Sequence, residues 1–395
     1  MKIVFVSGAR PNYMKIAPMI WAIRRLKQQG IADIPFALIH TGQHYDPQLF
    51  DVFFRELELP PPDYSLGVGS GSHVYQIAQV MERIEPLLEA TRPDVVVVVG
   101  DVNSTLAAAL SAAKLGIPLA HVEAGLRSFD RTMPEETNRL VTDTLSDFLF
   151  VSEESGRDNL LREGIDAGKI FFVGNVMIDS LHQSRLVWES SKIRDEMGLR
   201  HRDYGVVTLH RPANVDSPDS LREIMSALAK VAKDIPIIFP VHPRTRKRLE
   251  QMNGSAPNIR LRSGPIEANG IYGLEPLGYH EFMALIAGAR VVLTDSGGIQ
   301  EETTFLNVPC LTLRHNTERP VTVTHGTNRI IGTSPAAIME ESARILNSSR
   351  PELSPPPLWD GGASDRILSV LCATLSRAEA AVTVPQSEAA PAGSR

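Results

Sequence analysis

Cysteine is scarce in this chain: its 395 residues include two, Cys310 and Cys372. Two cysteines that lie far apart in apolar stretches exclude a disulfide framework. They also exclude a zinc site built on paired cysteines, and no histidine pair has convincing zinc spacing, so we predict no metal site. The scarcity fits a reducing compartment, and we expect the protein in the cytoplasm.

Long apolar runs and a surplus of positive charge are absent too. The longest apolar runs, such as Val95–Val99, fall far short of the roughly 20 residues that a membrane-spanning helix needs. The apolar start of the chain is too short for a signal peptide and predicts a first strand. Lysine and arginine number 40 against 46 aspartates and glutamates, and the net charge of −6 gives no global attraction to nucleic acid or membrane. This composition still allows an anionic small-molecule substrate, because such a substrate needs only a local basic pocket.

Short β-branched runs alternate with longer helical patterns throughout the chain. The expected strands are Ile3–Ser7, Phe36–His40, Val95–Val99, Leu119–Val122, Phe148–Val151, Gly205–Leu209, Ile235–Pro240, Ile259–Leu261, Val291–Leu293 and Cys310–Leu313. The expected helices are Met14–Gln29, Val74–Ala90, Ser104–Lys114, Glu136–Leu145, Ser220–Lys233, His280–Ala287 and Ile299–Phe305. This alternation predicts parallel sheets with helices on both faces. We predict an α/β fold of two doubly wound Rossmann-like domains that face each other across a cleft.

The length suits two domains of ordinary size. We place the N-terminal domain at residues 1–174, a helical linker region at 175–204 and the C-terminal domain at 205–357. A proline cluster at 355–357 precedes one amphipathic helix, at about Ser364–Arg377. Residues 378–395 are rich in alanine, proline, serine and glutamate, which predicts a disordered tail.

Ligands of parallel sheets bind beyond the carboxyl ends of the strands, so the residues that follow each strand are the site candidates. The turn after the first strand lacks the full Gly-x-Gly-x-x-Gly pattern, which argues against a dinucleotide site. It carries Arg10, and Lys15 follows one helical turn later. Both are candidates to bind an anion at the helix N-terminus, unless they are ordinary solvated side chains.

A second anion candidate follows the strand at Val291–Leu293. The segment reads Asp295-Ser296-Gly297-Gly298 and leads directly into a helix. Glycines let a backbone approach a ligand closely, and the first turn of a helix offers free N–H groups to a diphosphate. Glu302, further along the same helix, has the chemistry to accept hydrogen bonds from two ribose hydroxyls.

Carboxylates follow two neighbouring strands of the first half. Asp101 comes after five valines and is either a helix cap or a carboxylate in the cleft. Glu123 follows the next strand, and either Glu135 or Glu136 joins them later in the chain. Carboxylates in different surroundings can act as acid and base. The competing interpretation is a structural ion-pair network with the nearby arginines, Arg127 and Arg139. In the second half, His210 and His242 each follow a strand beside an arginine, which indicates a site role.

Taken together, these motifs resemble the non-hydrolysing UDP-N-acetylglucosamine 2-epimerases, in order, from Lys2 to about Leu375. The matching segments are Gly8-x-Arg10-Pro11, Thr41-Gly42-Gln43-His44, Gly100-Asp101, His121 to Arg127, Pro134 to Arg139, His210-Arg211, Pro240-Val241-His242-Pro243, Asp295 to Glu302 and Thr317-Glu318-Arg319-Pro320. The resemblance implies the fold of two-domain glycosyltransferases of the B type, with the final helix, within 358–377, packed back on the N-terminal domain. It also implies a homodimer that needs neither NAD nor a metal.

The implied reaction inverts carbon 2 of the sugar by eliminating UDP and adding it back. The resemblance assigns catalytic and sugar-contacting roles to Asp101, Glu123, Glu135 and His210. It assigns UDP binding to Arg10, Lys15, Ser296, Gly297, Gly298 and Arg319, the ribose contact to Glu302 and the uracil pocket to Phe282.

Two segments depart from the family pattern. Many members continue His-Arg with x-Glu-Asn, whereas this chain has Pro212-Ala213-Asn214. Family members that are activated by their own substrate carry a Gln-His-Arg segment. This chain reads Gln43-His44-Tyr45-Asp46 instead. The Tyr-Asp form also occurs in relatives that act on UDP-2,3-diacetamido-2,3-dideoxy-glucuronic acid, which leaves that substrate open. A glycosyltransferase of the same fold would also bind UDP, but three clustered carboxylates favour the epimerase. A non-catalytic nucleotide-sugar sensor is a second alternative, and the retention of every catalytic motif argues against it.

Overall fold

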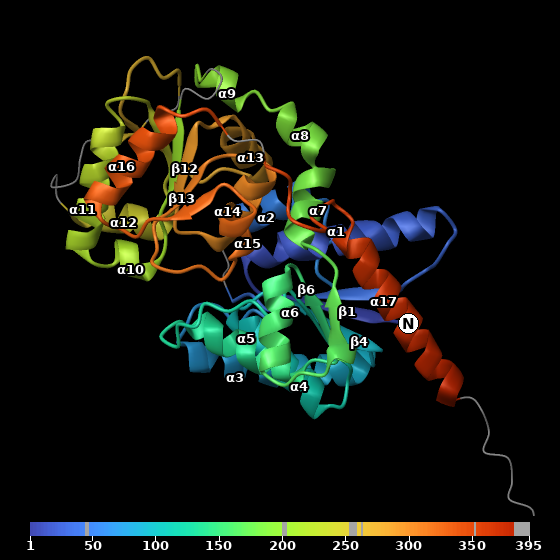
Figure 1. Cartoon of the computed structure of the whole chain (residues 1–395). Helices are drawn as coiled ribbons and strands as arrows, with labels where there is room; N and C mark the ends of the chain where they lie inside the picture. The colour runs from blue at the N-terminus through green and yellow to red at the C-terminus, as the bar shows by residue number, and fades with distance from the viewer. Residues whose placement is uncertain (44–46, 200–203, 253–258, 262–263, 351–352, 383–395) are drawn as a thin grey trace, which may run out of the picture.

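Two parallel seven-stranded sheets organise the chain, one in each half (Figure 1). The computed structural model describes residues 1–43, 47–199, 204–252, 259–261, 264–350 and 353–382. The first sheet has the order β3 (Tyr64–Ser65), β2 (Phe36–His40), β1 (Ile3–Ser7), β4 (Val95–Val99), β5 (Leu119–Val122), β6 (Phe148–Val151) and β7 (Ile170–Phe172). The second has the order β10 (Ile259–Leu261), β11 (Ile271–Leu274), β9 (Ile237–Pro240), β8 (Gly205–Thr208), β12 (Val291–Thr294), β13 (Cys310–Thr312) and β14 (Asn328–Ile330). The predicted doubly wound α/β fold is confirmed.

Helices connect most successive strands and cover both sheets. Those of the first half are α1 (Arg10–Gln28), α2 (Pro47–Glu56), α3 (His73–Thr91), α4 (Asn103–Lys114), α5 (Pro134–Leu145) and α6 (Glu154–Arg162), followed by a short 3₁₀ turn at Ala167–Lys169. Those of the second half are α10 (Pro212–Val215), α11 (Pro218–Val231), α12 (Pro243–Gln251), α13 (Tyr279–Gly288), α14 (Gly297–Phe305), α15 (Val321–Thr324) and α16 (Pro335–Leu346). Between the halves lie α7 (Val176–Gln183), α8 (Arg185–Glu189) and α9 (Ile193–Glu196).

Every predicted strand is present within two residues of its expected ends, but the structure adds four strands that the sequence pattern does not predict. Three of them, β3, β7 and β14, lie at sheet edges, and β11 lies one strand in from an edge. Edge strands are covered on fewer sides, so they need no continuous apolar run. Both residues of β3 are exposed, for example, and β14 begins with the polar pair Asn328 and Arg329. The sequences of β3 and β14 therefore carry little strand signal, whereas β7 and β11 are apolar but are runs of only three and four residues.

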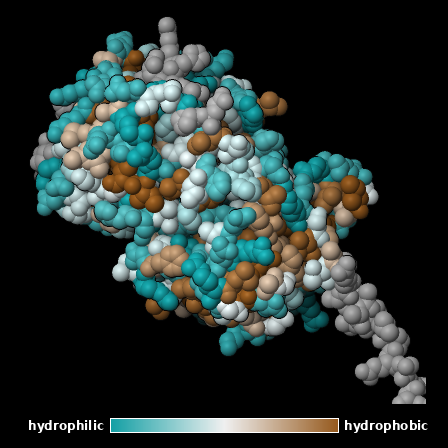
Figure 2. Space-filling view, viewed as in Figure 1, coloured by the Kyte–Doolittle hydropathy of each residue, from teal (hydrophilic) through white to brown (hydrophobic). Residues whose placement is uncertain are grey.

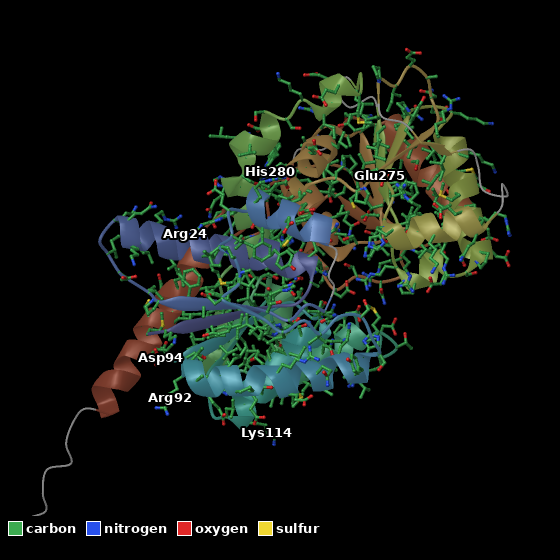
Figure 3. The ribbon with its side chains drawn as sticks, turned by 180° about the vertical axis from the view of Figure 1, so that it is seen from behind. Arg24, Arg92, Asp94, Lys114, Glu275 and His280 are labelled. Atoms are coloured by element: carbon green, nitrogen blue, oxygen red, sulfur yellow. The ribbon has the colours of Figure 1, made fainter. Side chains whose placement is uncertain are left out.

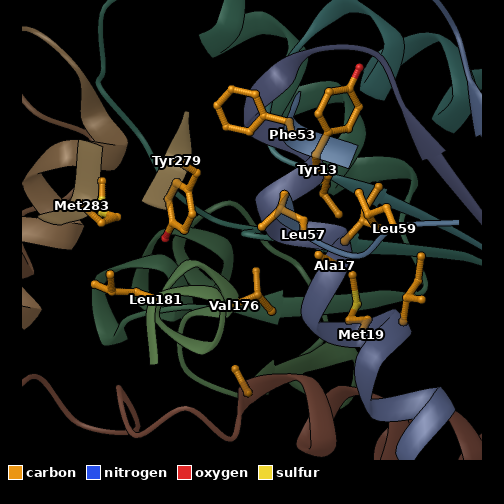
Figure 4. Close-up of a cluster of buried hydrophobic side chains, with 14 of the residues drawn as sticks. Tyr13, Ala17, Met19, Phe53, Leu57, Leu59, Val176, Leu181, Tyr279 and Met283 are labelled. Carbon is orange, nitrogen blue, oxygen red and sulfur yellow. The ribbon is translucent and has the colours of Figure 1, made fainter. Parts of the chain in front are cut away.

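The largest hydrophobic core runs through both halves of the molecule. Tyr13 and Ala17 of α1 and Phe53 of α2 face Tyr279 and Met283 of α13 in Figure 4. All five side chains are buried. Close packing of these buried side chains fixes the position of one sheet relative to the other. The outer faces of the two sheets are buried separately, the first against α3 and α4 and the second against α11 and α16.

The last helix, α17 (Ala363–Val382), returns to the first half of the chain, where it contacts α1 and α7. The Asp179 carboxylate of α7 accepts hydrogen bonds from the free N–H groups of Ala363 and Ser364 at 3.1 and 2.7 Å, which fixes the start of α17. Residues 378–382, which we expected in a disordered tail, continue this helix. The rest of that expected tail, residues 383–395, lies outside the described residues.

The carboxyl ends of the first sheet point toward the second half. Figure 3 shows Arg92 and Asp94, which directly precede β4, at the end of the molecule away from the second half, and it shows His280 and Glu275 at the other end. The residues that follow β4 and β5 therefore lie between the two halves. Figure 2 shows mostly hydrophilic residues on the surface, interrupted by small hydrophobic patches. None of the helices in the described part of the chain is long and apolar enough to cross a membrane.

Candidate active site

Glu123 is held by two cations that come from opposite halves of the molecule. Lys15 of α1 donates to one carboxylate oxygen, and Arg319, which precedes α15, donates to the other. The three side chains are 7–8% exposed. Burial acts to raise the pKa of Glu123, but Lys15 and Arg319 outweigh it and hold the pKa below its ordinary value. A carboxylate with these two partners marks the place where the halves meet.

The backbone at Glu123 is strained. Its φ of 75° lies in the left-handed region, which side chains other than glycine rarely adopt. Hydrogen bonds from the N–H groups of Glu123 and Ala124 to the carbonyl of Phe150, at 3.0 and 3.1 Å, hold the chain there. Such outliers persist where the surrounding structure enforces them, often at functional sites.

Asp101 does not cap α4. The residue at the cap position is Val102, whose side chain makes no cap hydrogen bond, so the helix-cap interpretation is wrong. Instead, Asp101 accepts a hydrogen bond from Arg139 at 2.5 Å, and Asn138 holds its backbone carbonyl at 2.8 Å. Burial raises the pKa of Asp101, but Arg139, Lys15 and Arg319 together lower it well below its ordinary range. Asp101 is thus an ionised carboxylate beside Glu123.

Glu135 and Glu136 have different environments. Glu136 is 2% exposed and accepts hydrogen bonds from the N–H groups of Ser128 and Phe129 at 2.9 and 3.0 Å. It also pairs with Arg139 at 2.8 Å, so its oxygens are committed to the loop before α5. Glu135 is 36% exposed, and its nearest cation is the guanidinium of Arg211 from the second half, at 3.9 Å. Of the two, Glu135 is the one that faces the opposite half.

The two arginines of the proposed ion-pair network behave differently. Arg139 belongs to the carboxylate cluster through its pair with Asp101. Arg127 is turned away from the cluster and pairs with Asp143 and Glu163, each at 2.7 Å. His121, from the same strand end, also pairs with Asp143, at 2.6 Å. Arg127 and His121 therefore belong to a structural ion-pair network around Asp143. Glu123 is not part of this network, because it binds Lys15 and Arg319 between the two halves.

His210 is oriented by Asp295. The Asp295 carboxylate is fully buried and accepts from the backbone N–H groups of His210 and Arg211 at 3.0 and 2.9 Å and from Asn214 at 3.1 Å. Nδ1 of His210 lies 2.9 Å from the same carboxylate, which favours the tautomer with the proton on Nδ1. Nε2 of His210 then remains available to a substrate. The sequence motifs do not assign this orienting role to Asp295 or Asn214.

The N-terminus of α14 is shaped to accept a ligand. Ser296 occupies the cap position, and its side chain makes no cap hydrogen bond. A Cβ atom at Gly297 would lie 2.4 Å from the guanidinium of Arg319, so a larger residue there would displace this guanidinium. At Gly298 a Cβ atom would meet one atom within 4 Å, a methyl carbon of Met177. The N–H groups at the start of α14 and the guanidinium of Arg319 are donors of the kind that bind a diphosphate.

Two further carboxylates anchor Arg319. Glu301 lies 3.0 Å from its Nε, and Glu318 lies 3.5 Å from one of its terminal nitrogens. Glu318 is completely buried, binds both terminal nitrogens of Arg314 at 3.0 and 2.7 Å, and lies 3.8 Å from Arg139. The sequence motifs do not identify Glu301 and Glu318 as functional. They do identify the next residue in each case, Glu302 and Arg319.

Arg10, Glu302 and Phe282 lie on the same side of the site as α13. Arg10 stacks over the ring of Phe53 at 5.3 Å. Burial, aided by Glu301, raises the pKa of Glu302 to about 8, and Arg10 opposes this rise. The same carboxyl acts on the phenol of Tyr279 in α13, the helix that carries the half-buried Phe282. The proposed ribose residue Glu302 therefore lies near α13, the helix that carries the proposed uracil residue Phe282.

Glu153 provides a test of the electrostatics behind the site. It is 2% exposed, and burial raises its pKa to about 7. A carboxyl whose pKa is raised on folding stabilises the fold below the unfolded pKa, and this contribution is lost as the pH rises through about 7. Glu153→Gln should therefore raise the free energy of unfolding at about pH 8 by up to ~3 kcal/mol, which a higher melting temperature would show. At about pH 5 the substitution should change the melting temperature little. The exposed neighbour gives the control, because Glu154→Gln should leave both melting temperatures unchanged. An equal shift at both pH values for Glu153→Gln would contradict the prediction.

Among the described residues, no cluster of histidine, cysteine, aspartate or glutamate has the geometry of a metal site. The predicted departure at Gln43-His44-Tyr45-Asp46 falls in part on residues 44–46, which lie outside the described residues. At the other departure, Asn214 is buried on Asp295, while Ala213 is exposed.

Two facing Rossmann-like sheets with a diphosphate-type helix terminus and a carboxylate cluster between them define a protein of the glycosyltransferase-B-type fold. Residues 25–372 match the family model described as UDP-N-acetylglucosamine 2-epimerase, and the chain belongs to this family.

Individual relatives agree with this assignment. A UDP-N-acetylglucosamine 2-epimerase from Methanocaldococcus jannaschii is 42% identical over 376 residues, which cover 94% of this chain and 99% of that protein. A UDP-2,3-diacetamido-2,3-dideoxy-D-glucuronate 2-epimerase from Pseudomonas aeruginosa is 38% identical over 376 residues, with 94% and 99% covered. The crystal structure of the M. jannaschii UDP-GlcNAc 2-epimerase in complex with UDP-GlcNAc and UDP superposes with a TM-score of 0.83, at 41% identity, over 94% of this chain and 100% of that chain.

Proposed function

We propose that this protein interconverts UDP-N-acetylglucosamine and UDP-N-acetylmannosamine by eliminating UDP and adding it back. The observation that carries the proposal is the position of Glu123 between Lys15 and Arg319, beside the N-terminus of α14. This arrangement places a carboxylate for proton transfer next to cations and N–H groups for a diphosphate. The M. jannaschii relative, whose crystal structure contains UDP-GlcNAc and UDP, supports a UDP-sugar as the ligand.

The chemistry follows from the sugar itself. The hydrogen on carbon 2 is not acidic, so its simple removal as a proton is implausible. In the elimination, the C2–H electron pair forms the C1–C2 double bond, the proton passes to a carboxylate, and the C1–O electron pair leaves with UDP. Re-addition of UDP with protonation of carbon 2 on the opposite face gives the epimer. Preorganised charges that face the departing diphosphate stabilise this step most.

Each group in the site has a role in this scheme. The carboxylates and the imidazole that transfer protons or contact the sugar are Asp101, Glu123, Glu135 and His210. Arg10, Lys15 and Arg319 neutralise the diphosphate, which also takes the Ser296 hydroxyl and the N–H groups at Gly297 and Gly298. Glu302 accepts the ribose hydroxyls, and Phe282 packs against the uracil.

A second substrate has specific support. The relative from P. aeruginosa is named for UDP-2,3-diacetamido-2,3-dideoxy-D-glucuronate, and it is nearly as similar as the M. jannaschii relative. The same elimination would serve this sugar, because the reacting carbons are the same. The two substrates differ at carbons 3 and 6, so side chains near the sugar, not the acid–base groups, decide between them.

Proton NMR in heavy water tests the proposal. The purified protein, with UDP-N-acetylglucosamine and without NAD or added metal, should give an equilibrium mixture with UDP-N-acetylmannosamine, and deuterium should enter at carbon 2. Epimerisation without deuterium uptake would show that carbon 2 does not exchange its proton through the protein. Turnover of the diacetamido-uronate alone would establish the second substrate. Transfer of the sugar to an acceptor, without epimerisation, would show a glycosyltransferase.

A further inference from the structure

Lys15 and Arg319 each have two binding partners, one in this structure and one in the proposed function. In this structure both bind Glu123, one on each carboxylate oxygen. In the proposed function both bind the diphosphate. Glu123 is the one carboxylate within ion-pair distance of Lys15 in the described part of the chain. The catalytic carboxylate and the leaving group therefore compete for the same cations.

The two cations lie at the points where a diphosphate would pass. The Arg319 guanidinium lies against Gly297 at the N-terminus of α14, where a Cβ atom would come within 2.4 Å of it. The Lys15 ammonium lies against Gly100 in the turn before Asp101, where a Cβ atom would come within 2.8 Å. One cation thus lies at the diphosphate turn and the other at the carboxylate cluster.

The charges around Glu123 cannot all be neutralised at once when a nucleotide binds. Four charged groups from separate elements act on or respond to Glu123: Lys15 of α1, Arg319 before α15, Asp101 after β4 and Glu301 of α14. These are two cations and two further carboxylates. A diphosphate adds more negative charge to this buried cluster, and its several oxygens can bind both cations at once.

We propose that the diphosphate of the bound nucleotide takes Lys15 and one nitrogen of Arg319 from Glu123. Binding of the leaving group thereby frees the carboxylate that transfers the proton of the sugar. This inference rests on the proposed function. Arg319 need not move as a whole, because Glu301 holds its Nε at 3.0 Å and Glu318 lies 3.5 Å from its other terminal nitrogen. The fixed backbone of Glu123 keeps the freed carboxylate in place.

The exchange changes the affinity of Glu123 for a proton. With both cations in place, their attraction outweighs the effect of burial on the pKa. Once the diphosphate holds the cations, burial and the neighbouring Asp101 and Glu301 favour the protonated carboxyl. UDP binding should therefore be accompanied by proton uptake, and Glu123 becomes a better base only when a leaving group is present.

Calorimetry of UDP binding tests the exchange. UDP is titrated into the protein at about pH 6 in buffers of different ionisation enthalpy, which gives the number of protons taken up. The wild-type protein should take up a proton fraction approaching one more than Glu123→Gln does. Glu123→Gln gives the baseline, because the β-phosphate of UDP has a pKa of about 6 and contributes its own proton change in both proteins. Glu123→Gln should also bind UDP about tenfold more tightly, because no carboxylate competes for the cations. Glu89→Gln on α3 is the control: it removes an exposed carboxylate outside the cluster, so proton uptake should persist.

The outcomes separate the exchange from the function on which it rests. If UDP does not bind the folded wild-type protein, the proposed function fails. If the wild type takes up no more protons on UDP binding than Glu123→Gln does, or if Glu123→Gln binds UDP no more tightly than the wild type, the exchange is wrong. Should Glu123→Gln not fold, Lys15→Met replaces it, since loss of one exchanged cation should weaken UDP binding and reduce proton uptake together. Weaker binding with undiminished uptake in Lys15→Met would overturn the proposal.

Discussion

At least two of the variants Asp101→Asn, Glu123→Gln and Glu135→Gln should lower kcat/KM for epimerisation by about 100- to 10,000-fold. Each change keeps the size of the side chain and removes its ionisation, so an acid–base group loses its function while packing survives. We expect this pattern at two or more of the three positions, with melting temperatures and UDP binding retained. Rates come from the NMR assay, and the exposed Glu89→Gln on α3 provides the control with unchanged activity.

A structural role predicts the opposite pattern. Asp101 pairs with the buried Arg139, and Glu123 pairs with two buried cations, so loss of charge could act through stability alone. If all three amide variants melt early yet still epimerise, the cluster is a structural network and the mechanism fails. Glu136→Gln shows what that pattern looks like, because Glu136 holds the loop before α5 and should lower the melting temperature.

The central strands of both sheets could be predicted from sequence, because they are buried on both faces. β4 is the clearest case, with five valines that are all completely buried. The linker between the halves was less predictable. Its charged stretch predicts one helical region, but it forms three short helices that break at Ser184 and near Ser190. Local pattern does not reveal such breaks, because tertiary contacts place them.

The positions of the site residues could be predicted, but their partners could not. The rule that ligands bind beyond parallel strands leads to Asp101, Glu123 and His210 directly. It does not decide between Glu135 and Glu136, because adjacent residues on a helix point about 100° apart and the neighbouring loop sets which is buried. Sequence also could not show that Arg127 turns toward Asp143, since both belong to segments rich in charged residues.

The buried carboxylates behind Arg319 are the main feature that the sequence does not reveal. Glu301 and Glu318 are at most 1% exposed, and a buried charge without a partner is costly. They are tolerated because Arg319, Arg314 and Asn175 bind them. Only the fold brings α14 and the segment before α15 together, so neither motif alone indicates the pairing.

Arg319→Ala should lower kcat/KM by about 100-fold or more, because the variant loses a preorganised cation at the departing diphosphate. It should also lower the melting temperature, since Glu123, Glu301 and Glu318 lose a shared buried partner. The double variant Arg319→Met with Glu301→Gln separates these effects, because it removes one of the stranded charges and fills part of the space. It should regain stability and remain inactive. Unchanged kcat/KM in the single variant would remove Arg319 from the site, and activity that returns together with stability in the double variant would make its role structural. The expected result, stability without activity, assigns Arg319 to the leaving group.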